Sequence, residues 1–167
     1  MLTSKSRSHR ATLPTEEKVD VKIVEIVRDN FIDVVELELE KAQEKYVTSN
    51  LFSIAESKLF TPSSNLRAIC VSDKVVGFLE YEFGESDADK DGCTIWRFMI
   101  DRRRQNSGIG KIALGLLLEE IKAQERCKIV DVYYNPENIV AKRLYANFGF
   151  KEVGDRDDGD VIAEITL

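Results

Sequence analysis

One stretch constrains the fold of this chain more than any other. It runs from Trp96 to Lys122 and reads WRFMIDRRRQNSGIGKIALGLLLEEIK. The pattern predicts a strand, a basic turn, a glycine loop and then a helix. Gly108 and Gly110 leave the backbone N–H groups of the loop uncovered by side chains. Because the first N–H groups of a helix lack acceptors inside it, they attract phosphate oxygens together with the helix dipole.

Positive charge surrounds this loop, since Arg102, Arg103 and Arg104 precede it and Lys111 lies on the first helical turn. The stretch therefore predicts a pyrophosphate-binding site, and a tight turn with a solvated basic edge stays open as the alternative. No Gly-Lys-Ser/Thr closes the loop, so it is not a Walker loop. The glycine spacing half-fits the GxGxxG dinucleotide motif, because Ala113 stands at the third glycine position.

The net charge of the chain limits the kinds of partner that it is expected to bind. The 167 residues carry 24 Lys and Arg against 30 Asp and Glu, a formal net charge of −6. This balance argues against general nucleic-acid binding and suits a cationic small substrate. No apolar run approaches membrane-spanning length, so we expect neither a nucleic-acid nor a membrane partner. The sequence leaves a monomer and a homodimer open.

The number and positions of the histidine and cysteine residues exclude several kinds of catalytic and metal site. The only histidine is His9, in a polar N-terminal tail, which excludes Ser-His-Asp and Cys-His catalysis and a His-rich metal site. Cys70, Cys93 and Cys127 are widely spaced and form no CxxC pair, so we expect no metal and a reducing, cytoplasmic location. Any proton transfer must therefore use Glu, Asp, Tyr, Cys, Lys or water.

The chain divides into a tail and one domain. Residues 1–18 are rich in Ser, Thr, Arg and Lys, and we expect a flexible tail there. No acidic residue precedes Glu16, which weakly resembles an organelle presequence, but no clear amphipathic stripe accompanies it. Residues 19–167 have the length of a single domain with its own core.

Apolar periodicity predicts seven strands and four helices in residues 19–167. The strands are expected over Val19–Val27, Leu66–Val71, Val75–Phe83, Thr94–Ile100, Ile129–Tyr134, Phe150–Val153 and Val161–Leu167. The helices are expected over Ile32–Lys45 with Asn30 as its cap, Asn50–Leu59, Ile112–Ala123, and from Asn135-Pro136 through Phe148.

This order predicts an α/β fold with a mixed, mostly antiparallel sheet of about seven strands flanked by helices. The strands in the middle form an antiparallel meander, and the connection from Thr94 to Tyr134 is a parallel, right-handed crossover. A ligand cleft is expected where the parallel pair meets the helix N-termini.

A second motif lies downstream, in the run NPENIVAKRLYANFGF that ends at Phe150. Asn138, Ala141 and Tyr145 are three or four residues apart and share one helical face. Two patterns together resemble the GCN5-related N-acetyltransferase (GNAT) superfamily: Gln/Arg-x-x-Gly-x-Gly/Ala over Gln105 to Gly110, and Asn-x-x-Ala-x-x-Leu-Tyr-x-x-x-Gly-Phe from Asn138. The resemblance covers residues 19–167.

More narrowly, the chain resembles the spermine/spermidine (diamine) N-acetyltransferase branch of that superfamily. The similar segments are Tyr46–Lys58, Val76–Phe78 and Ile95–Asp101. The branch has an aromatic residue before the loop glutamine and Gly-Lys after it. Here Arg104, Asn106 and Ser107 stand at those positions, so the loop departs from the branch pattern but stays basic.

The resemblance implies acetyl-CoA as cosubstrate. It implies that the loop holds the pyrophosphate through Gln105, Asn106, Ser107, Gly108, Ile109, Gly110 and Lys111. The backbone of Phe98, Met99 and Ile100 would pair with the pantetheine arm, while the side chains of Phe98 and Ile100 are expected in the core. Asn135, Asn138 and Lys142 complete the expected cofactor residues, with a helix cap and a solvated lysine as the alternatives for Asn138 and Lys142.

The resemblance also implies a general acid, Tyr145, which would protonate the coenzyme A thiolate when an amine attacks the thioester directly. From periodicity alone this tyrosine is a packing aromatic. Glu56, Glu80 and Glu82 are the candidates for the general base, with surface or substrate-orienting carboxylates as the alternative. Glu56 and Glu80 are the residues expected to bind the amine substrate.

The sequence therefore predicts an acetyl-CoA-dependent N-acetyltransferase that acts on a primary amine, a polyamine such as spermidine or spermine. Within the same enzyme class, a protein N-terminus or an amino antibiotic stays open as the acceptor. Outside that class, a non-catalytic acyl-CoA-binding module stays open.

Overall fold

The computed structural model describes residues 19–84 and 91–167, and the predicted flexible tail, residues 1–18, lies outside this part of the chain. One seven-stranded sheet has the order β1-β2-β3-β4-β5-β7-β6. The elements are β1 (Val21–Glu25), α1 (Phe31–Val35), α2 (Asn50–Phe60), β2 (Asn65–Val71), β3 (Lys74–Phe83), β4 (Gly92–Ile100), the 3-10 turn η1 (Arg102–Arg104), α3 (Ile109–Ala123), β5 (Ile129–Tyr134), α4 (Ile139–Asn147), β6 (Lys151–Asp155) and β7 (Val161–Thr166).

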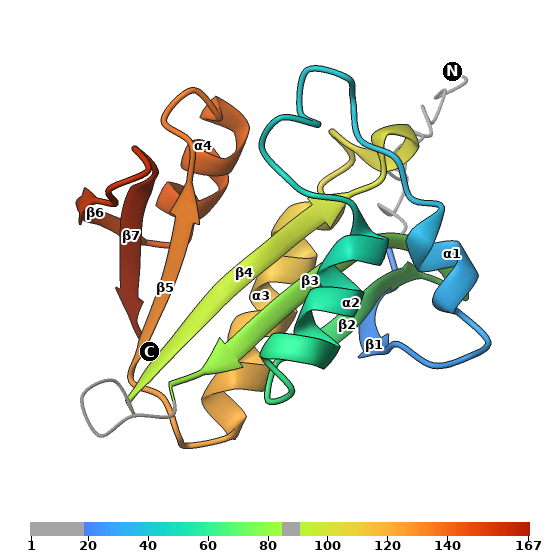
Figure 1. Ribbon diagram of the computed structural model, residues 1–167, viewed down its shortest axis with the longest axis horizontal. Helices are drawn as coiled ribbons and strands as arrows, with labels where there is room; N and C mark the ends of the chain where they lie inside the picture. Colours follow the sequence, from blue (N-terminus) through green and yellow to red (C-terminus); the bar gives the residue numbers. More distant parts are fainter. Residues whose placement is uncertain (1–18, 85–90) are drawn as a thin grey trace, which may run out of the picture.

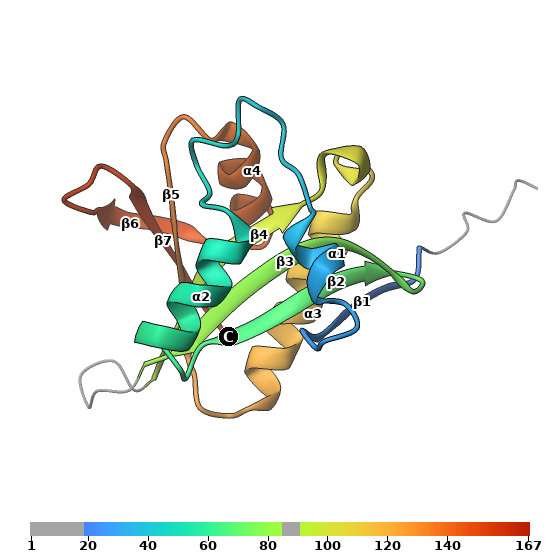
Figure 2. The same ribbon diagram turned by 45° about the vertical axis from the view of Figure 1, so that its right-hand side comes forward.

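The sheet is mixed, as the sequence predicted. Strands β4 and β5 pair in parallel, and every other neighbouring pair of the described strands is antiparallel. Helices α1 and α2 cover one face, and α3 lies on the other (Figures 1 and 2). Among the described residues, no helix combines the length and apolarity of a membrane span.

Each face of the sheet has its own core. The larger core joins α3 and α4 to the sheet through side chains such as Leu114, Leu117 and Tyr145. The smaller core lies under α1 and α2 and is built around Val34 and Phe78. Because successive strand side chains point to opposite faces, the apolar strands β2 and β3 supply both cores. The helices are thereby fixed on either side of the same strands.

Strand β4 contains a bulge that changes which face of the sheet the side chains of its second half point to. Tyr81 of β3 faces Ile95, whereas its neighbour Glu80 faces Arg97, so Trp96 has no partner on β3. One extra residue in a strand shifts the alternation of its side chains between the two faces. Ile95 and Phe98 therefore both belong to the α3 side, although they are three residues apart.

Strands β4 and β5 part after four residue pairs. The parallel pairing runs from Gly92 with Ile129 to Ile95 with Val132, and it goes no further among the described residues. The remainder of β4, residues 96–100, separates from β5, and the two strands diverge toward the top of Figure 1. The N-termini of α3 and α4 follow the diverging strand ends. This gap is where the sequence predicted a cleft.

The first predicted helix is wrong in two respects, its end and its cap. Helix α1 ends at Val35 rather than at Lys45, and residues 36–49 form a connection of turns and irregular backbone. Asn30 does not cap α1 with its side chain, which accepts from the Val27 N–H at 2.8 Å and donates to the Glu25 carbonyl at 2.9 Å. Side-chain bonds to nearby backbone compete with regular helix, and here they define the turn before α1.

Helix α4 begins at Ile139, later than the predicted start at Asn135-Pro136. The Oδ1 of Asn135 accepts from the Glu137 N–H at 3.0 Å, and this bond turns the chain before the helix. Asn138 then becomes the N-cap and accepts from the Ala141 N–H at 3.2 Å. Helix α3, in contrast, begins earlier than predicted: it starts at Ile109, three residues before the start expected from its apolar stripe.

Asp101 ties the end of β4 to the connection over residues 36–49, which we call the bridging loop. Asp101 is 2% exposed. Its carboxylate accepts hydrogen bonds from the Arg103 N–H at 2.9 Å, from the Arg103 guanidinium at 2.8 Å and from the Glu38 N–H at 3.1 Å. The Arg103 side chain and these backbone donors lower the pKa of Asp101 from 3.8 to about 2. The charged form is therefore part of the folded structure.

Asp101→Asn should lower the free energy of unfolding by roughly 2 kcal/mol at neutral pH, because a shift of one pKa unit corresponds to about 1.4 kcal/mol. Since the pKa is lowered in the folded state, this contribution is complete above pH 3.8 and is lost as the pH falls toward about 2. Urea unfolding at several pH values measures the difference between variant and wild type. The exposed Asp73→Asn is the control, and a difference that persists unchanged at low pH contradicts the assignment.

Gly77→Ala should lower the free energy of unfolding by about 1–3 kcal/mol, the usual cost of overpacking. A Cβ at Gly77 would lie 2.6 Å from the Met99 carbonyl oxygen and 3.0 Å from Cδ1 of both Ile69 and Ile100. The backbone carbonyl of the neighbouring strand cannot move aside. Gly154→Ala is the matched control, since a Cβ there meets nothing within 4 Å. Equal stability of the two variants in urea would show that β3 and β4 are not packed this closely.

Candidate active site

A groove of about 480 Å³ lies in the gap between β4 and α4. It brings together most of the residues that the sequence predicted to bind a cofactor: Phe98, Met99, Ile100, Gln105, Asn106, Gly108, Ile109, Gly110, Lys111 and Asn138. Tyr145 lines it as well. Three predicted cofactor residues, Ser107, Asn135 and Lys142, do not line this groove.

The glycine loop borders the groove with a helix start that no side chain caps. Gly108 is the N-cap of the 15-residue α3 and has a φ of +80°, a left-handed conformation that side chains disfavour. A Cβ at Gly108 would meet nothing within 4 Å, so it is the backbone conformation, and not crowding, that favours glycine. Without a side-chain cap, the first N–H groups of α3 keep their hydrogen-bonding capacity for an anion.

The three arginines before the loop have different partners. Arg102 pairs with Glu38 at 2.7 Å, and Arg103 pairs with Asp101 at 2.8 Å. Arg104 lines the groove and forms no ion pair with any other described residue. Arg104 and Lys111 are thus the two cationic side chains of the groove. The sequence showed a basic run but not which arginine faces the ligand, because that depends on the carboxylates nearby.

The bridging loop closes one side of the groove. The side-chain amides of Gln43 and Gln105 bond each other reciprocally, at 3.1 and 2.8 Å, and Gln105 also donates to the Ile100 carbonyl at 2.9 Å. At the other side, Lys45 pairs with Glu137 at 2.7 Å. Gln105 therefore holds the loop in place with its amide. The residues that the bridging loop adds to the groove were not predicted from the sequence: Leu39, Glu40, Gln43, Tyr46 and Val47.

A second cavity, of about 280 Å³, shares a wall with the groove. Residues that line both include Tyr46, Phe98, Asn138 and Tyr145. The second cavity also has aromatic and charged side chains of its own, which come from β4, β5 and the β6–β7 turn: Trp96, Arg97, Tyr133, Tyr134, Arg156, Asp158 and Asp160. Asn135 lines this cavity and not the groove.

Tyr145 lies at the junction of the two cavities. It is 5% exposed, stacks on Tyr134 with ring centroids 5.8 Å apart and contacts the Phe150 ring at 5.4 Å. Its hydroxyl makes no hydrogen bond to any residue of the described ranges 19–84 and 91–167. Burial raises the pKa of Tyr145, with a smaller contribution from Tyr134, so the phenol stays protonated at neutral pH. The residue is buried, but its unpaired, protonated hydroxyl is accessible from the cavities and can donate a proton to a group in either.

The remaining predicted cofactor residues have local partners. The Asn138 side chain caps α4, which is the alternative that the sequence left open for it. Lys142 is half exposed and pairs with Glu152 at 2.9 Å. The Ser107 hydroxyl donates to the Arg104 carbonyl within the loop. Asn138 lines both cavities, whereas Ser107 and Lys142 line neither.

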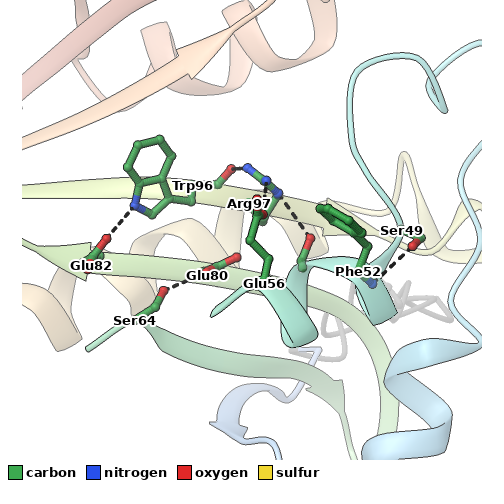
Figure 3. Close-up of polar contacts among 9 residues, drawn as sticks. Ser49, Phe52, Glu56, Ser64, Glu80, Glu82, Trp96 and Arg97 are labelled. Carbon is green, nitrogen blue, oxygen red and sulfur yellow. Dashed lines mark hydrogen bonds and ion pairs between the residues drawn. The ribbon is translucent and has the colours of Figure 1, made fainter. Parts of the chain in front are cut away.

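The predicted substrate residues Glu56 and Glu80, and the third base candidate Glu82, lie beside Arg97 and Trp96 (Figure 3), and none of the three lines the second cavity. Glu56 of α2 pairs with the Arg97 guanidinium at 3.4 Å. Glu82 of β3 accepts from the indole N–H of Trp96 at 3.2 Å. Arg97 and Trp96 line the second cavity, so Glu56 and Glu82 act on its wall through these two side chains.

Glu80 is the most buried of these carboxylates, at 5% exposure. It accepts from the Ser64 hydroxyl at 2.7 Å and faces Arg97 across the β3–β4 pairing. Burial raises the pKa of Glu80, and the Ser64 hydroxyl and Arg97 partly oppose this effect. In the described part of the chain, no group of three or more His, Cys, Asp or Glu side chains could hold a metal ion.

Known proteins resemble this chain over most of its length. The model of the acetyltransferase (GNAT) family matches residues 23–150. A spermine/spermidine N(1)-acetyltransferase of Bacillus subtilis is 29% identical over 145 residues, which cover 83% of this chain and 93% of the relative. The match over more than half of the chain establishes its family.

Two solved structures share the fold at low sequence identity. An aminoglycoside acetyltransferase AAC(6')-Ib in complex with coenzyme A has a TM-score of 0.72 and 15% identity, over 88% of this chain and 95% of that structure. The ribosomal-protein-S18-alanine N-acetyltransferase of Escherichia coli has a TM-score of 0.67 and 14% identity, over 89% and 94%. Together with the family match, this shared fold identifies the chain as a member of the acetyltransferase (GNAT) family and an acetyl-CoA-dependent N-acetyltransferase.

Proposed function

We propose that this enzyme transfers the acetyl group of acetyl-CoA to a primary amine of a polyamine such as spermidine or spermine. The observation that carries the proposal is the junction at Tyr145 of two cavities with different chemistry. The groove offers cations and a helix N-terminus, which suit a pyrophosphate, and the second cavity offers aromatic rings and carboxylates, which suit an amine. The similarity to the Bacillus enzyme supports a polyamine as acceptor.

The groove is where coenzyme A is proposed to bind. The uncapped start of α3 with Arg104 and Lys111 fits the charge of a pyrophosphate. From Trp96 onward, the edge of β4 toward β5 has no strand partner among the described residues. The Trp96 carbonyl accepts from the Arg97 side chain and the Ile100 carbonyl from Gln105, and the backbone between them along this edge suits the amide groups of a pantetheine arm, as an added strand would. Gln105 contributes by holding the bridging loop over the groove.

When bound, acetyl-CoA supplies an acetyl group as a thioester. The acceptor nitrogen, reaching the thioester carbon from the second cavity, forms the new C–N bond as the C–S bond breaks. Tyr145 donates its hydroxyl proton to the departing sulfur. The carboxylates predicted as the base, Glu56, Glu80 and Glu82, lie outside the lining of both cavities, so the amine proton reaches them only through water. Any of these carboxylates therefore acts as a base through a water relay.

An acceptor panel tests the polyamine assignment. Release of coenzyme A thiol is measured with spermidine, spermine, an aminoglycoside and a peptide with an N-terminal alanine, all at the same acetyl-CoA concentration. We expect the highest kcat/KM with spermidine or spermine. Background thiol release with both polyamines, together with turnover of another acceptor, would reject the polyamine and leave the acetyltransferase in place.

Tyr145→Phe should lower kcat at least about tenfold while leaving the affinity for coenzyme A unchanged, as expected for a lost general acid. The phenyl ring keeps the stacking on Tyr134 and Phe150, so the fold should be preserved. Tyr134→Phe is the matched control, because that hydroxyl already donates to Glu152 at 2.9 Å. Unchanged turnover in Tyr145→Phe, or an equal loss in both variants, would remove Tyr145 from the proton transfer.

Arg104→Gln should weaken coenzyme A binding roughly tenfold, since a charge-assisted contact to phosphate is lost. The difference from wild type should shrink as the salt concentration rises. Arg102→Gln is the control in the same turn, because Arg102 pairs with Glu38 and does not line the groove. Calorimetric titration of coenzyme A measures all three proteins. Wild-type affinity in Arg104→Gln would place the pyrophosphate elsewhere.

A further inference from the structure

The second cavity has an uneven distribution of charge. Four charged side chains line it, and three of them have partners: Arg97 pairs with Glu56 at 3.4 Å, and Arg156 pairs with Asp158 at 3.2 Å. The fourth is Asp160, whose carboxylate makes no hydrogen bond or ion pair with any residue of the described ranges. The cavity therefore presents one negative charge that its own walls do not neutralise.

The backbone of Asp160 is fixed on both sides. Its carbonyl accepts from the Arg156 N–H at 2.8 Å, and its N–H donates to Oδ1 of Asp158 at 3.2 Å. The Gly159 N–H donates to the Arg156 carbonyl at 2.9 Å, which closes the turn between β6 and β7. Asp160 is half-buried just before β7 begins. The free carboxylate is thus held by a rigid turn, and binding a ligand costs little ordering of the chain.

Aromatic rings line the same cavity as this carboxylate. The Arg156 guanidinium carbon lies 4.5 Å from the Tyr133 ring centroid, which anchors the turn to β5. The Tyr133 ring lies 5.6 Å from the Trp96 ring. Aromatic faces attract cations, and Arg156 already shows this attraction in the cavity wall. An aromatic enclosure with one uncompensated carboxylate fits the ammonium group of an extended amine.

We propose that Asp160 binds a second ammonium group of the acceptor while the reacting amine lies beside Tyr145. Asp160 is then a specificity-determining residue that selects amines with two or more positive charges over monoamines. This inference rests on the proposed function, because it places the acceptor in the second cavity. It assigns no part of the proton transfer to Asp160, so the residue acts on substrate affinity.

The test compares Asp160→Asn with Asp157→Asn, which removes the same charge from an exposed position of the same turn outside the cavity. At saturating acetyl-CoA, Asp160→Asn should raise the KM for spermidine at least about tenfold, the usual effect of a lost charge-assisted hydrogen bond. Its kcat should stay at the wild-type level. With butylamine, which carries one charge, wild type and both variants should have the same KM.

Three results would overturn the assignment: an unchanged spermidine KM in Asp160→Asn, an equal rise in Asp157→Asn, or a fall in kcat without a change in KM. Calorimetric titration of spermidine into the full-length proteins separates this inference from the proposed function. Equal spermidine affinity in wild type and Asp160→Asn rejects the role of Asp160 and leaves polyamine acetylation in place. A wild type that neither binds nor acetylates spermidine or spermine rejects the acceptor, and the subsite with it.

Discussion

The structure depends on the parting of two parallel strands. The pairing of β4 with β5 stops at Ile95 and Val132, and a strand edge without a partner has backbone groups that need hydrogen bonds. The protein itself supplies one of these hydrogen bonds, because the Gln105 side-chain amide donates to the Ile100 carbonyl. The part of β4 that borders the groove, residues 98–100, lies beside the site proposed for the cofactor. The same gap admits the N-terminus of α3 on one side and Tyr145 of α4 on the other, so the proposed cofactor site and the proposed proton donor meet where the sheet is incomplete.

Local ion pairing, and not net charge, determines which charge each of the two cavities presents. The chain is acidic, with a net charge of −6, yet the groove presents Arg104 and Lys111. This is because the neighbouring arginines are neutralised by Glu38 and Asp101, which leaves Arg104 without a partner in the described chain. The second cavity shows the converse, since its two arginines are paired and one carboxylate is not. In both cases the unpaired charge lies on the wall where we propose that a ligand binds.

The sequence predicted those parts of the site that are specified by neighbouring residues. Gly108 lies between a loop and a helix within a few positions, and Tyr145 shares a helical face with Asn138, so spacing alone placed both on their elements. The role of Tyr145 as general acid came from the resemblance to the family, because periodicity alone predicts a packing aromatic. The bridging loop could not, because its course depends on Asp101 and Gln105, some sixty residues away in sequence, and those contacts override the helical propensity of residues 36–45. Asp160 was missed for a similar reason. In sequence it is one of several acidic residues in a turn, and only the pairing of Asp158 with Arg156 distinguishes it.

The burial of Tyr145 joins packing and chemistry in one residue. A phenol enclosed by Tyr134 and Phe150 contributes to the core, and the same desolvation raises its pKa and keeps the proton on it until a sulfur anion forms nearby. The stack also connects the two halves of the site. Tyr134 lies at the end of β5, next to the wall that carries Tyr133 and the β6–β7 turn. In this proposal, acceptor selection and proton donation belong to residues of β5, α4 and the β6–β7 turn, whereas cofactor binding belongs to β4 and α3. A change in the β6–β7 turn can therefore alter the acceptor without disturbing the residues proposed to bind coenzyme A.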